Sequence, residues 1–375
     1  MEYTFNLTDK KYELDLETGC LKCGNMICKL CCEERTYDEG KCLLKLNSKC
    51  NMHCRYCFQL KENQNEKAIY LRDFAFLLEN IFYSYENIYL YGGEPLIDSN
   101  MENLIFCLEK LPANKTLSFF SNGAFSPEIL EVLIMYKSKL GKIVITIDGT
   151  KELHELRRIT KNGISSYDII IRNLRELSTN EIGFAVQVNV DMQNINCIDK
   201  IIEEISSDSS IRVNQYIINR VLGSDLDVQE IDVLRAYCAV KKRIQSSRIN
   251  VNSSILRCLS IFLAGGGLSY RYCDIGKSVV FDFQHQRIYT CPQRAQTVIG
   301  NFDTNAYKID IDKVGKYKEI ARRGIEKCIK CPYIGICCGL ECPMEHKEMQ
   351  NCKSQVHEIL SFVFENANLF FPIVN

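Results

Sequence analysis

The chain has 375 residues, of which 46% are hydrophobic and 25% are charged, and its formal net charge is −1. These values are ordinary for a globular protein and give no reason to expect a nucleic-acid or anionic-membrane partner. The start of the chain lacks the pattern of a signal peptide, and no apolar run approaches the ~18 residues of a membrane span, so we expect a cytoplasmic protein. The 21 cysteines are unusual, because a disulfide scaffold would be short and exported.

The first segment, residues 1–41, is predicted to hold a short hairpin over residues 3–18 and then a cysteine-rich arm. The arm contains two Cys-x-x-Cys pairs, formed by Cys20, Cys23, Cys28 and Cys31. Two such pairs indicate a small metal site, either zinc or a further cluster. The alternative is that these thiols have no specific role or assist the docking of a peptide.

Strands and helices alternate strictly between residues 42 and 225. Strands are predicted at 42–48, 87–93, 117–123, 142–149, 183–190 and 213–219, with helices at 71–82, 99–111, 126–140, 166–177 and 198–206. Such alternation predicts a parallel sheet with right-handed crossovers. Six units are fewer than the eight of a closed barrel, so we expect an α/β fold that forms a partial (β/α)6 TIM-like barrel. A doubly wound sheet is the competing architecture.

Polar residues and glycines gather where the predicted strands end. Both architectures place their chemistry beyond the C-terminal ends of the strands. The residues at these ends are Cys50, Cys54, Cys57, Gly92, Gly93, Glu94, Ser121, Asn122, Asp148, Gln187 and Asn189. Structural metal sites built from cysteines usually take four ligands, so three closely spaced cysteines after the first strand indicate a site that is left open.

Two motifs in this region resemble those of radical SAM enzymes. The spacing of Cys50, Cys54 and Cys57, with Tyr56 before the last cysteine, resembles the family signature. "YGGEPL" at 91–96 is similar to the family's S-adenosylmethionine-binding segment, and residues 146–168 are similar to a stretch of its peptide- and protein-modifying branch. The resemblance implies a 4Fe–4S cluster on three thiolates, an open iron that binds S-adenosylmethionine, and cleavage to a 5′-deoxyadenosyl radical.

The resemblance also implies which side chains bind the cofactor. Glu94 would hold the methionyl amino group beside the backbone of two glycines, and Tyr56 would pack near the adenine. The remaining contacts would go to the ribose and the methionyl carboxylate, with ordinary strand-end polarity as the alternative. The expected cofactor-binding residues are Tyr56, Gly92, Gly93, Glu94, Ser121, Asn122 and Gln187, with Asn189 as an alternative to Gln187.

A second group of cysteines lies in a C-terminal domain predicted at 271–375, which a helical bridge at 226–270 joins to the barrel. The group comprises Cys273, Cys291, Cys328, Cys331, Cys337, Cys338, Cys342 and Cys352. Pairs two residues apart in turns with Pro and Gly indicate metal, and the chemistry alone leaves zinc and iron–sulfur open.

This C-terminal region is similar to the iron–sulfur SPASM extension of radical SAM enzymes. The resemblance implies one or two auxiliary 4Fe–4S clusters, an outer one on Cys328, Cys331, Cys337 and Cys352 and an inner one on Cys273, Cys291 and Cys342. Cys258 is an available fourth ligand for the inner cluster, which could instead keep an open iron. Cys337 and Cys338 compete for one ligand role.

The implied function is that of a radical SAM peptide maturase. Such an enzyme removes a hydrogen from a ribosomally made precursor peptide and forms a thioether or carbon–carbon crosslink, with electrons from a flavodoxin- or ferredoxin-type donor. The alternative is a sulfatase-maturating, formylglycine-forming enzyme. Those relatives place an Asp after the ligand equivalent to Cys291, where Pro292 stands here. An electron relay would have no use for the cofactor segment Gly92–Glu94, and a zinc-stapled binding scaffold would be colourless where an iron–sulfur protein is brown.

Overall fold

The computed structural model describes residues 2–7, 10–15, 20–23, 26–28, 41–59, 68–221, 226–244, 248–263, 275, 278–326 and 352–371. Most described strands form one sheet, in the order β13-β12-β11-β9-β8-β7-β5-β14-β15-β16-β17. These strands are β5 (Cys42–Lys45), β7 (Ile88–Tyr91), β8 (Leu117–Ser121), β9 (Leu140–Thr146), β11 (Phe184–Val190), β12 (Gln215–Arg220), β13 (Ile249–Asn252), β14 (Val279–Asp282), β15 (Arg287–Tyr289), β16 (Val298–Phe302) and β17 (Tyr307–Ile309).

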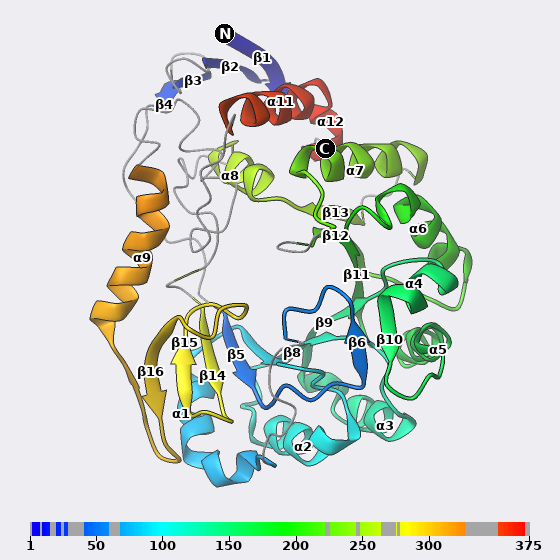
Figure 1. Cartoon of the computed structure of the whole chain (residues 1–375), viewed down its shortest axis with the longest axis vertical. Helices are drawn as coiled ribbons and strands as arrows, with labels where there is room; N and C mark the ends of the chain where they lie inside the picture. Colours follow the sequence, from blue (N-terminus) through cyan, green and yellow to red (C-terminus); the bar gives the residue numbers. More distant parts are fainter. Residues whose placement is uncertain are drawn as a thin grey trace.

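Helices connect the parallel strands and cover one face of the sheet, which is curved (Figure 1). They are α1 (Ala75–Ser84), α2 (Met101–Lys110), α3 (Pro127–Met135), α4 (Lys151–Arg157), α5 (Ser166–Thr179), α6 (Ile198–Ser207), α7 (Glu230–Ile244) and α8 (Ser254–Leu263), and α9 (Ile311–Glu326), α11 (Cys352–Glu365) and α12 (Ala367–Phe370) follow. Local sequence fixes the ends of some of these helices. Ser126 caps α3 by accepting from the Ile129 amide at 3.3 Å, and Pro127 follows at the first helical position.

The order of the strands decides between the two expected architectures. From β5 to β13, neighbours in the main sheet are also neighbours in sequence, and all these pairs are parallel. In a doubly wound sheet the strand order reverses partway, so helices cover both faces. When the order runs in one direction only, right-handed crossovers put every connecting helix on the same face. The predicted partial barrel is therefore confirmed.

The barrel extends further than the sequence indicated at both ends. β13 pairs with β12 inside the segment 226–270, for which only helices were expected, because four residues of "INVN" are too short to show a clear period. β14 pairs with β5 in parallel and leads into the antiparallel strands β15–β17. Residues 278–309 therefore continue the barrel sheet, although a separate domain was expected from residue 271.

The two faces of the sheet differ in composition, as the two-residue period of a strand allows. In β11, Val186, Val188 and Val190 lie buried in the core beneath the helices, so Gln187 and Asn189 belong to the inner face. A small apolar cluster of Leu43, Val280 and Tyr289 lies apart from that core, with Tyr89 and Tyr91 packed against it. The inner face is therefore aromatic around β5, β7 and β15 and polar around β11–β13.

A second, four-stranded antiparallel sheet is formed by β1 (Glu2–Leu7), β2 (Lys10–Asp15), β3 (Cys20–Cys23) and β4 (Met26–Cys28). The first two strands confirm the predicted hairpin, and the cysteine-rich arm supplies the other two. Cys31 lies outside the described residues, so a metal site in this arm stays a prediction. Among the helices that the structure describes, none is long and apolar enough to cross a membrane.

Candidate functional site

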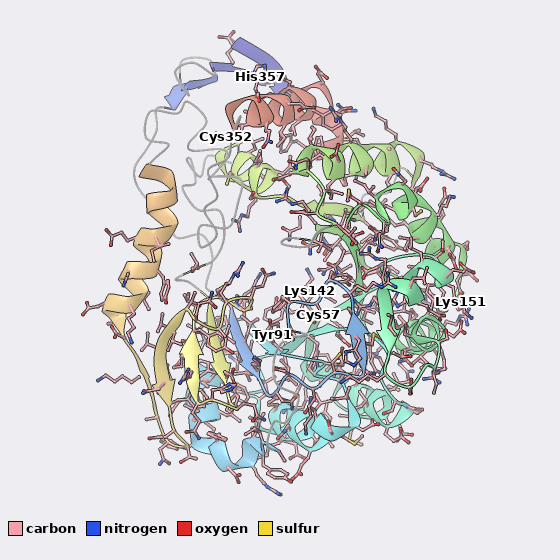
Figure 2. The ribbon with its side chains drawn as sticks, viewed as in Figure 1. Cys57, Tyr91, Lys142, Lys151, Cys352 and His357 are labelled. Carbon is pink, nitrogen blue, oxygen red and sulfur yellow. The ribbon has the colours of Figure 1, made fainter. Side chains whose placement is uncertain are left out.

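The three cysteines of the first motif follow β5 on a loop that faces the inner side of the barrel. β6 (Met52–Cys54) lies within this loop and pairs with β10 (Arg158–Thr160), with Cys54 opposite Arg158. Cys50, Cys54 and Cys57 form no disulfide with a described residue, and Cys50 and Cys57 are partly exposed while Cys54 is buried. Figure 2 shows Cys57 and Tyr91 at the inner side of the sheet, far from Cys352 on α11. The loop therefore holds three available thiols at the C-terminal end of the first barrel strand.

The turn Gly92–Gly93 packs directly against this cysteine loop. Both glycines have positive φ, +94° and +49°, and a Cβ on Gly93 would lie 2.0 Å from the Lys49 carbonyl oxygen. The Glu94 amide donates to the same carbonyl at 2.8 Å, and the Gly93 amide donates to Gln59 Oε1 at 2.9 Å. Only glycine permits this approach of two backbones, which explains the motif.

Glu94 joins the ends of β7 and β8. Its carboxylate is only 2% exposed and accepts from the Leu96 amide at 2.9 Å, Ser121 Oγ at 2.8 Å and the Asn122 amide at 2.5 Å. Burial raises the pKa of this carboxyl, and these donors oppose the rise. Because three protein donors occupy the carboxylate, it braces the glycine turn, and the expected contact with a methionyl ammonium stays a prediction.

Asn122 connects the end of β8 to the cysteine loop. Its Nδ2 donates to Asn51 Oδ1 at 2.6 Å and lies 3.8 Å from Cys50 Sγ, and Asn51 in turn donates to the Ala124 carbonyl at 2.9 Å. The structure thus brings together Cys50, Glu94, Ser121 and Asn122, which three different strand ends contribute. Their predicted roles as cofactor contacts are consistent with this placement.

Tyr56 lies in a buried ionic network on the other side of the loop. Its hydroxyl donates to the Asp148 carboxylate and accepts from Arg158 Nη1 at 2.5 Å and Asn189 Nδ2 at 3.2 Å. Burial raises the pKa of Tyr56 well above its usual value, although Arg158 opposes the shift, so the hydroxyl stays protonated at neutral pH. The Arg157 guanidinium lies 5.3 Å from the centre of the Tyr56 ring, and the expected packing of this ring against adenine is untested.

The two arginines and His154 were missed as site residues by the sequence analysis. Arg157 is 1% exposed, pairs with Asp191, and donates to the Asn189 carbonyl at 3.0 Å. His154 Nδ1 accepts from the Asp148 amide at 3.3 Å, and burial together with the arginines lowers the pKa of this imidazole well below its usual value. The signal available in the sequence was the cluster of charges in "KELHELRR", which an exposed helix face also explains.

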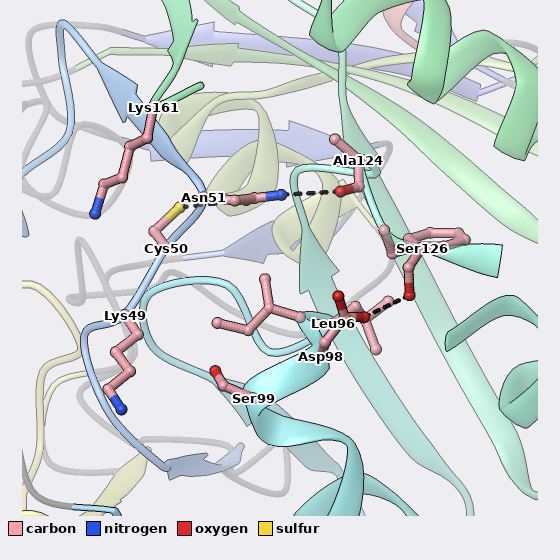
Figure 3. Close-up of a pocket in the computed structure, with 11 residues that line it drawn as sticks. Lys49, Cys50, Asn51, Leu96, Asp98, Ser99, Ala124, Ser126 and Lys161 are labelled. Atoms are coloured by element: carbon pink, nitrogen blue, oxygen red, sulfur yellow. Dashed lines mark hydrogen bonds between the residues drawn. The ribbon is translucent and has the colours of Figure 1, made fainter. Parts of the chain in front are cut away.

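A cavity of about 460 Å³ opens beside Cys50. Cys50, Asp98 and Ser126 line it together with two lysines, Lys49 and Lys161. Figure 3 shows the side chains of both lysines on the same side of the pocket as Cys50. Two positive charges therefore border the cavity beside the cysteine loop.

A segment of the C-terminal region contacts the cofactor turn. The Tyr91 hydroxyl donates to the Pro292 carbonyl at 2.9 Å and accepts from Gln59 Nε2 at 3.3 Å. Cys291, the first predicted auxiliary-cluster ligand that the structure describes, therefore lies one residue from a contact with the turn of β7. Cys352 begins α11 and is partly exposed, and Cys258 is fully buried in α8. The other predicted ligands lie outside the described residues: Cys273, Cys328, Cys331, Cys337 and Cys342.

Comparison with known proteins finds relatives of the barrel region. Residues 44–205 match the family model described as the radical SAM superfamily. This match covers less than half of the chain, and it shows that the barrel region is similar to that superfamily. A GTP 3′,8-cyclase of Aquifex aeolicus is 25% identical over 159 residues, which cover 39% of this chain and 45% of that protein. The chain thus spans less than half the length of the curated relatives it matches.

Solved structures extend the likeness in fold to most of the chain. The structure described as native anSMEcpe with bound AdoMet is 16% identical, covers 89% of this chain and 100% of that one, and has a TM-score of 0.69. Streptococcus suis SuiB bound to precursor peptide SuiA is 15% identical, covers 79% of this chain and 70% of that one, and has a TM-score of 0.59. At these identities the likeness shows the shared fold.

The residues present fit both cofactors of a radical SAM protein. Three thiols on one loop, none of them in a disulfide with a described residue, can each hold one iron of a cubane cluster. Among the described residues, no three His, Cys, Asp or Glu side chains are placed to share a single metal ion. A cubane cluster does not need such a group, because each of its irons takes its own thiolate. The glycine turn brings its backbone directly against the cysteine loop, where a Cβ on Gly93 would lie 2.0 Å from the Lys49 carbonyl oxygen. Cys50, Cys54 and Cys57 would therefore hold the cluster, and the turn would border the S-adenosylmethionine.

Proposed function

We propose that this protein is a radical SAM enzyme that modifies a ribosomally made peptide and forms a thioether or carbon–carbon crosslink in it. The observation that carries the proposal is the contact between Tyr91 and Pro292, because it holds the Cys291 segment against the cofactor turn. A C-terminal segment that carries Cys291 and adjoins the cofactor turn can act on the same substrate as the barrel. One or two auxiliary 4Fe–4S clusters in that region are part of the proposal.

The inner face of the barrel supports a large, polar substrate. Tyr89 and Phe120 stack there with ring centroids 5.2 Å apart, and the Lys142, Asn250 and Asn252 side chains are exposed. A peptide offers both apolar side chains and backbone donors and acceptors, which such a mixed surface can bind. The relatives anSMEcpe and SuiB, with the Cp18Cys peptide and the SuiA precursor peptide bound, have the same fold.

The proposed chemistry divides between the cofactors and this chain. When bound and reduced, the cluster supplies the electron that cleaves S-adenosylmethionine and so provides the hydrogen-abstracting radical. The glycine turn and Glu94 would fix the cofactor against the cysteine loop, since their backbone contacts allow little movement. The network of Asp148, Tyr56 and Arg158 would hold the other wall rigid, because each group is buried and bonded to the next. No catalytic base is assigned.

Formylglycine formation is the alternative that the sequence left open. Pro292 offers no carboxylate, and Asp282 of β14, which lies opposite Arg287 on the neighbouring strand β15, already has other partners. It pairs with Lys45 at 3.5 Å and accepts from the Tyr289 hydroxyl at 2.5 Å. Burial alone would raise the pKa of Asp282, but Tyr289, Lys45 and His285 together hold it below its usual value, which makes a poor base. These contacts favour the crosslinking proposal.

Electrons would reach the cluster from outside the barrel. Lys49 and Lys161 border the cavity beside Cys50, and a flavodoxin- or ferredoxin-type donor is acidic on the surface that it presents. We propose that such a donor docks there in a reducing cytoplasm, where the 21 cysteines would stay free of disulfides.

The test is performed on protein that has been purified and reconstituted without oxygen. Iron, sulfide and zinc are measured first. The protein is then incubated with S-adenosylmethionine, a reductant and three probes: the SuiA peptide, the Cp18Cys peptide and a pool of short linear peptides with varied Cys and Ser positions. We expect 5′-deoxyadenosine together with a peptide product that has lost the mass of two hydrogens.

The Cys54→Ala variant is the matched negative control, because the cluster loses one of its three anchors, and we expect it to form no 5′-deoxyadenosine. Cys107→Ala removes a buried thiol in α2, far along the chain from the loop, and should retain cleavage. Cleavage by Cys54→Ala would overturn the cluster assignment. A product that has lost sulfur and gained an aldehyde would replace crosslinking by formylglycine formation.

A further inference from the structure

A row of carboxamide side chains crosses three neighbouring strands at the polar end of the inner face. Asn189 of β11, Asn219 of β12 and Asn252 of β13 occupy the same register position, each opposite the next. Asn219 Nδ2 donates to Asn189 Oδ1 at 3.0 Å, and Asn252 Nδ2 donates to Asn219 Oδ1 at 2.9 Å. Gln187 Nε2 also donates to Asn189 Oδ1, at 2.9 Å. We call Asn189, Asn219 and Asn252 the amide row.

The direction of these hydrogen bonds is fixed by the buried carboxylate at one end. Asp148 can only accept, so the single proton of the Tyr56 hydroxyl points toward it. The hydroxyl must then accept from Asn189, whose Nδ2 lies at 3.2 Å. The carbonyl of Asn189 therefore faces Asn219 and requires a donor there, and the same argument orients Asn252. All members of the amide row donate toward Asp148 and direct their carbonyl oxygens away from it.

The far end of the amide row is an exposed acceptor. Asn189 is 9% exposed, Asn219 is partly exposed, and Asn252 is exposed. Among the residues that the structure describes, none donates to Asn252 Oδ1, and β13 is the edge of the main sheet. Each amide that donates toward a carboxylate becomes a stronger acceptor at its own oxygen, because hydrogen bonds in a chain polarise one another. Asn252 Oδ1 is thus a strengthened hydrogen-bond acceptor at the end of the amide row, and no described residue donates to it.

We propose that Asn252 is a peptide-positioning residue, whose Oδ1 accepts a backbone N–H of an extended substrate. This inference rests on the proposed function and names the element of the peptide that this wall of the barrel recognises. A peptide backbone fits the site because it carries N–H donors at regular spacing in any sequence. The row links this contact to Tyr56, so the bound backbone has a fixed distance from the cofactor loop.

The experiment begins by finding a ligand without assuming its sequence. The reconstituted holoenzyme with S-adenosylmethionine is used to select binders from a pool of random linear peptides, and the dissociation constant of the best binder is measured by fluorescence anisotropy. Asn252→Ala should weaken binding about five- to tenfold, as expected for one lost hydrogen bond. Asn219→Ala should weaken it similarly, because Asn252 loses the partner that orients it. Cleavage of S-adenosylmethionine without peptide should stay unchanged in both variants.

The matched control is Asn250→Ala. Asn250 is exposed on the same strand two residues earlier, and its amide donates to the Arg248 carbonyl at 3.5 Å instead of joining the row. We expect wild-type affinity for this variant. A second measurement replaces the peptide's backbone amides by esters, one at a time. One ester should weaken binding to the wild type but cause no further loss with Asn252→Ala, since the N–H that it removes has no acceptor left.

The outcomes separate the two proposals. If the wild-type holoenzyme enriches no peptide, or binds a nucleotide such as GTP in place of one, the proposed function fails and this inference with it. If a peptide binds but Asn252→Ala behaves as Asn250→Ala does, the function stands and the positioning role is wrong. A fall in peptide-free cleavage for Asn252→Ala would assign the row to the cofactor site and overturn the inference.

Discussion

The two ends of the inner rim are built in different ways. At the end formed by β5, β7 and β8, two backbones touch, and the glycine turn leaves no room for a side chain against the cysteine loop. At the end formed by β11, β12 and β13, the wall consists of carboxamide side chains joined by directional hydrogen bonds. Close packing of two backbones determines the geometry of the first end. Directional hydrogen bonds between side chains determine the geometry of the second end.

The difference between the two ends matches what each would have to bind. A cofactor is the same molecule in every turnover, so a rigid backbone cradle can fit it closely. A peptide substrate differs from residue to residue, and polar groups that bind its backbone tolerate that variation. Four predictions test how firmly this contrast holds, beginning with the largest effect.

Gly93→Ala should disrupt the cofactor end most. The added Cβ would lie 2.0 Å from the Lys49 carbonyl oxygen at a φ of +49°, so we expect a loss of about 3 kcal/mol in the free energy of unfolding and almost no iron incorporation. Gly163→Ala is the control, because Gly163 also has positive φ, +72°, but has no atom within 4 Å of the added Cβ. Urea unfolding and iron analysis of both variants provide the measurement. Equal effects would mean that backbone strain, not contact with the loop, explains the motif.

Glu94→Gln should weaken the brace between β7 and β8 while keeping its shape. The substitution replaces one carboxylate oxygen, which accepts hydrogen bonds, by an NH2 group that faces donors. We expect this to lower the free energy of unfolding by about 2 kcal/mol. We expect the KM for S-adenosylmethionine to rise about tenfold in peptide-free cleavage, because the turn loses its support. Glu102→Gln is the control on α2, where an exposed carboxylate pairs with Arg72 at 2.7 Å and contributes little. A normal KM for Glu94→Gln would remove the carboxylate from the cofactor end.

His154 should make the stability of the network behind Tyr56 sensitive to pH. Burial lowers the pKa of this histidine in the folded state, so the unfolded chain binds the proton first as pH falls. The wild type should therefore lose about 1.4 kcal/mol per pH unit below about pH 6.5, until the folded pKa is reached. Urea unfolding of wild type and His154→Gln between about pH 7.5 and about pH 5.5 measures the difference. Parallel pH curves would show that the imidazole does not titrate on unfolding.

Tyr91→Phe should have the smallest effect. It removes the bonds to Pro292 and Gln59, at a cost of about 1 kcal/mol, without creating a cavity. The Cys291 segment would lose a contact with the turn, so we expect fewer modified peptides per 5′-deoxyadenosine formed, while peptide-free cleavage continues. Tyr83→Phe, on an exposed position of α1, should change neither quantity. An unchanged ratio for Tyr91→Phe would mean that this contact does not couple the two regions.

Local sequence patterns were sufficient for much of the barrel. All six expected strands are present, because buried parallel strands are apolar runs that end in glycine or polar residues. β13 was missed because four residues are too few to show a strand periodicity. β14 was assigned to another domain because its pairing with β5 joins residues that are far apart in the sequence. The sequence also did not show that the Glu94 carboxylate accepts from Leu96, Ser121 and Asn122, and its contact with the cofactor stays a prediction.

The sequence by itself determined the chemistry of this protein: three cysteines at cluster spacing, a glycine turn, and the alternation that makes a parallel barrel. These are properties of neighbouring residues, and so they can be read without the fold. Only the tertiary structure decided the amide row, the contact of Tyr91 with Pro292, and the ion network of Tyr56. Those depend on strand order and register, which bring together residues up to 201 positions apart. Such contacts contribute to stability only in the folded state, where these distant residues meet.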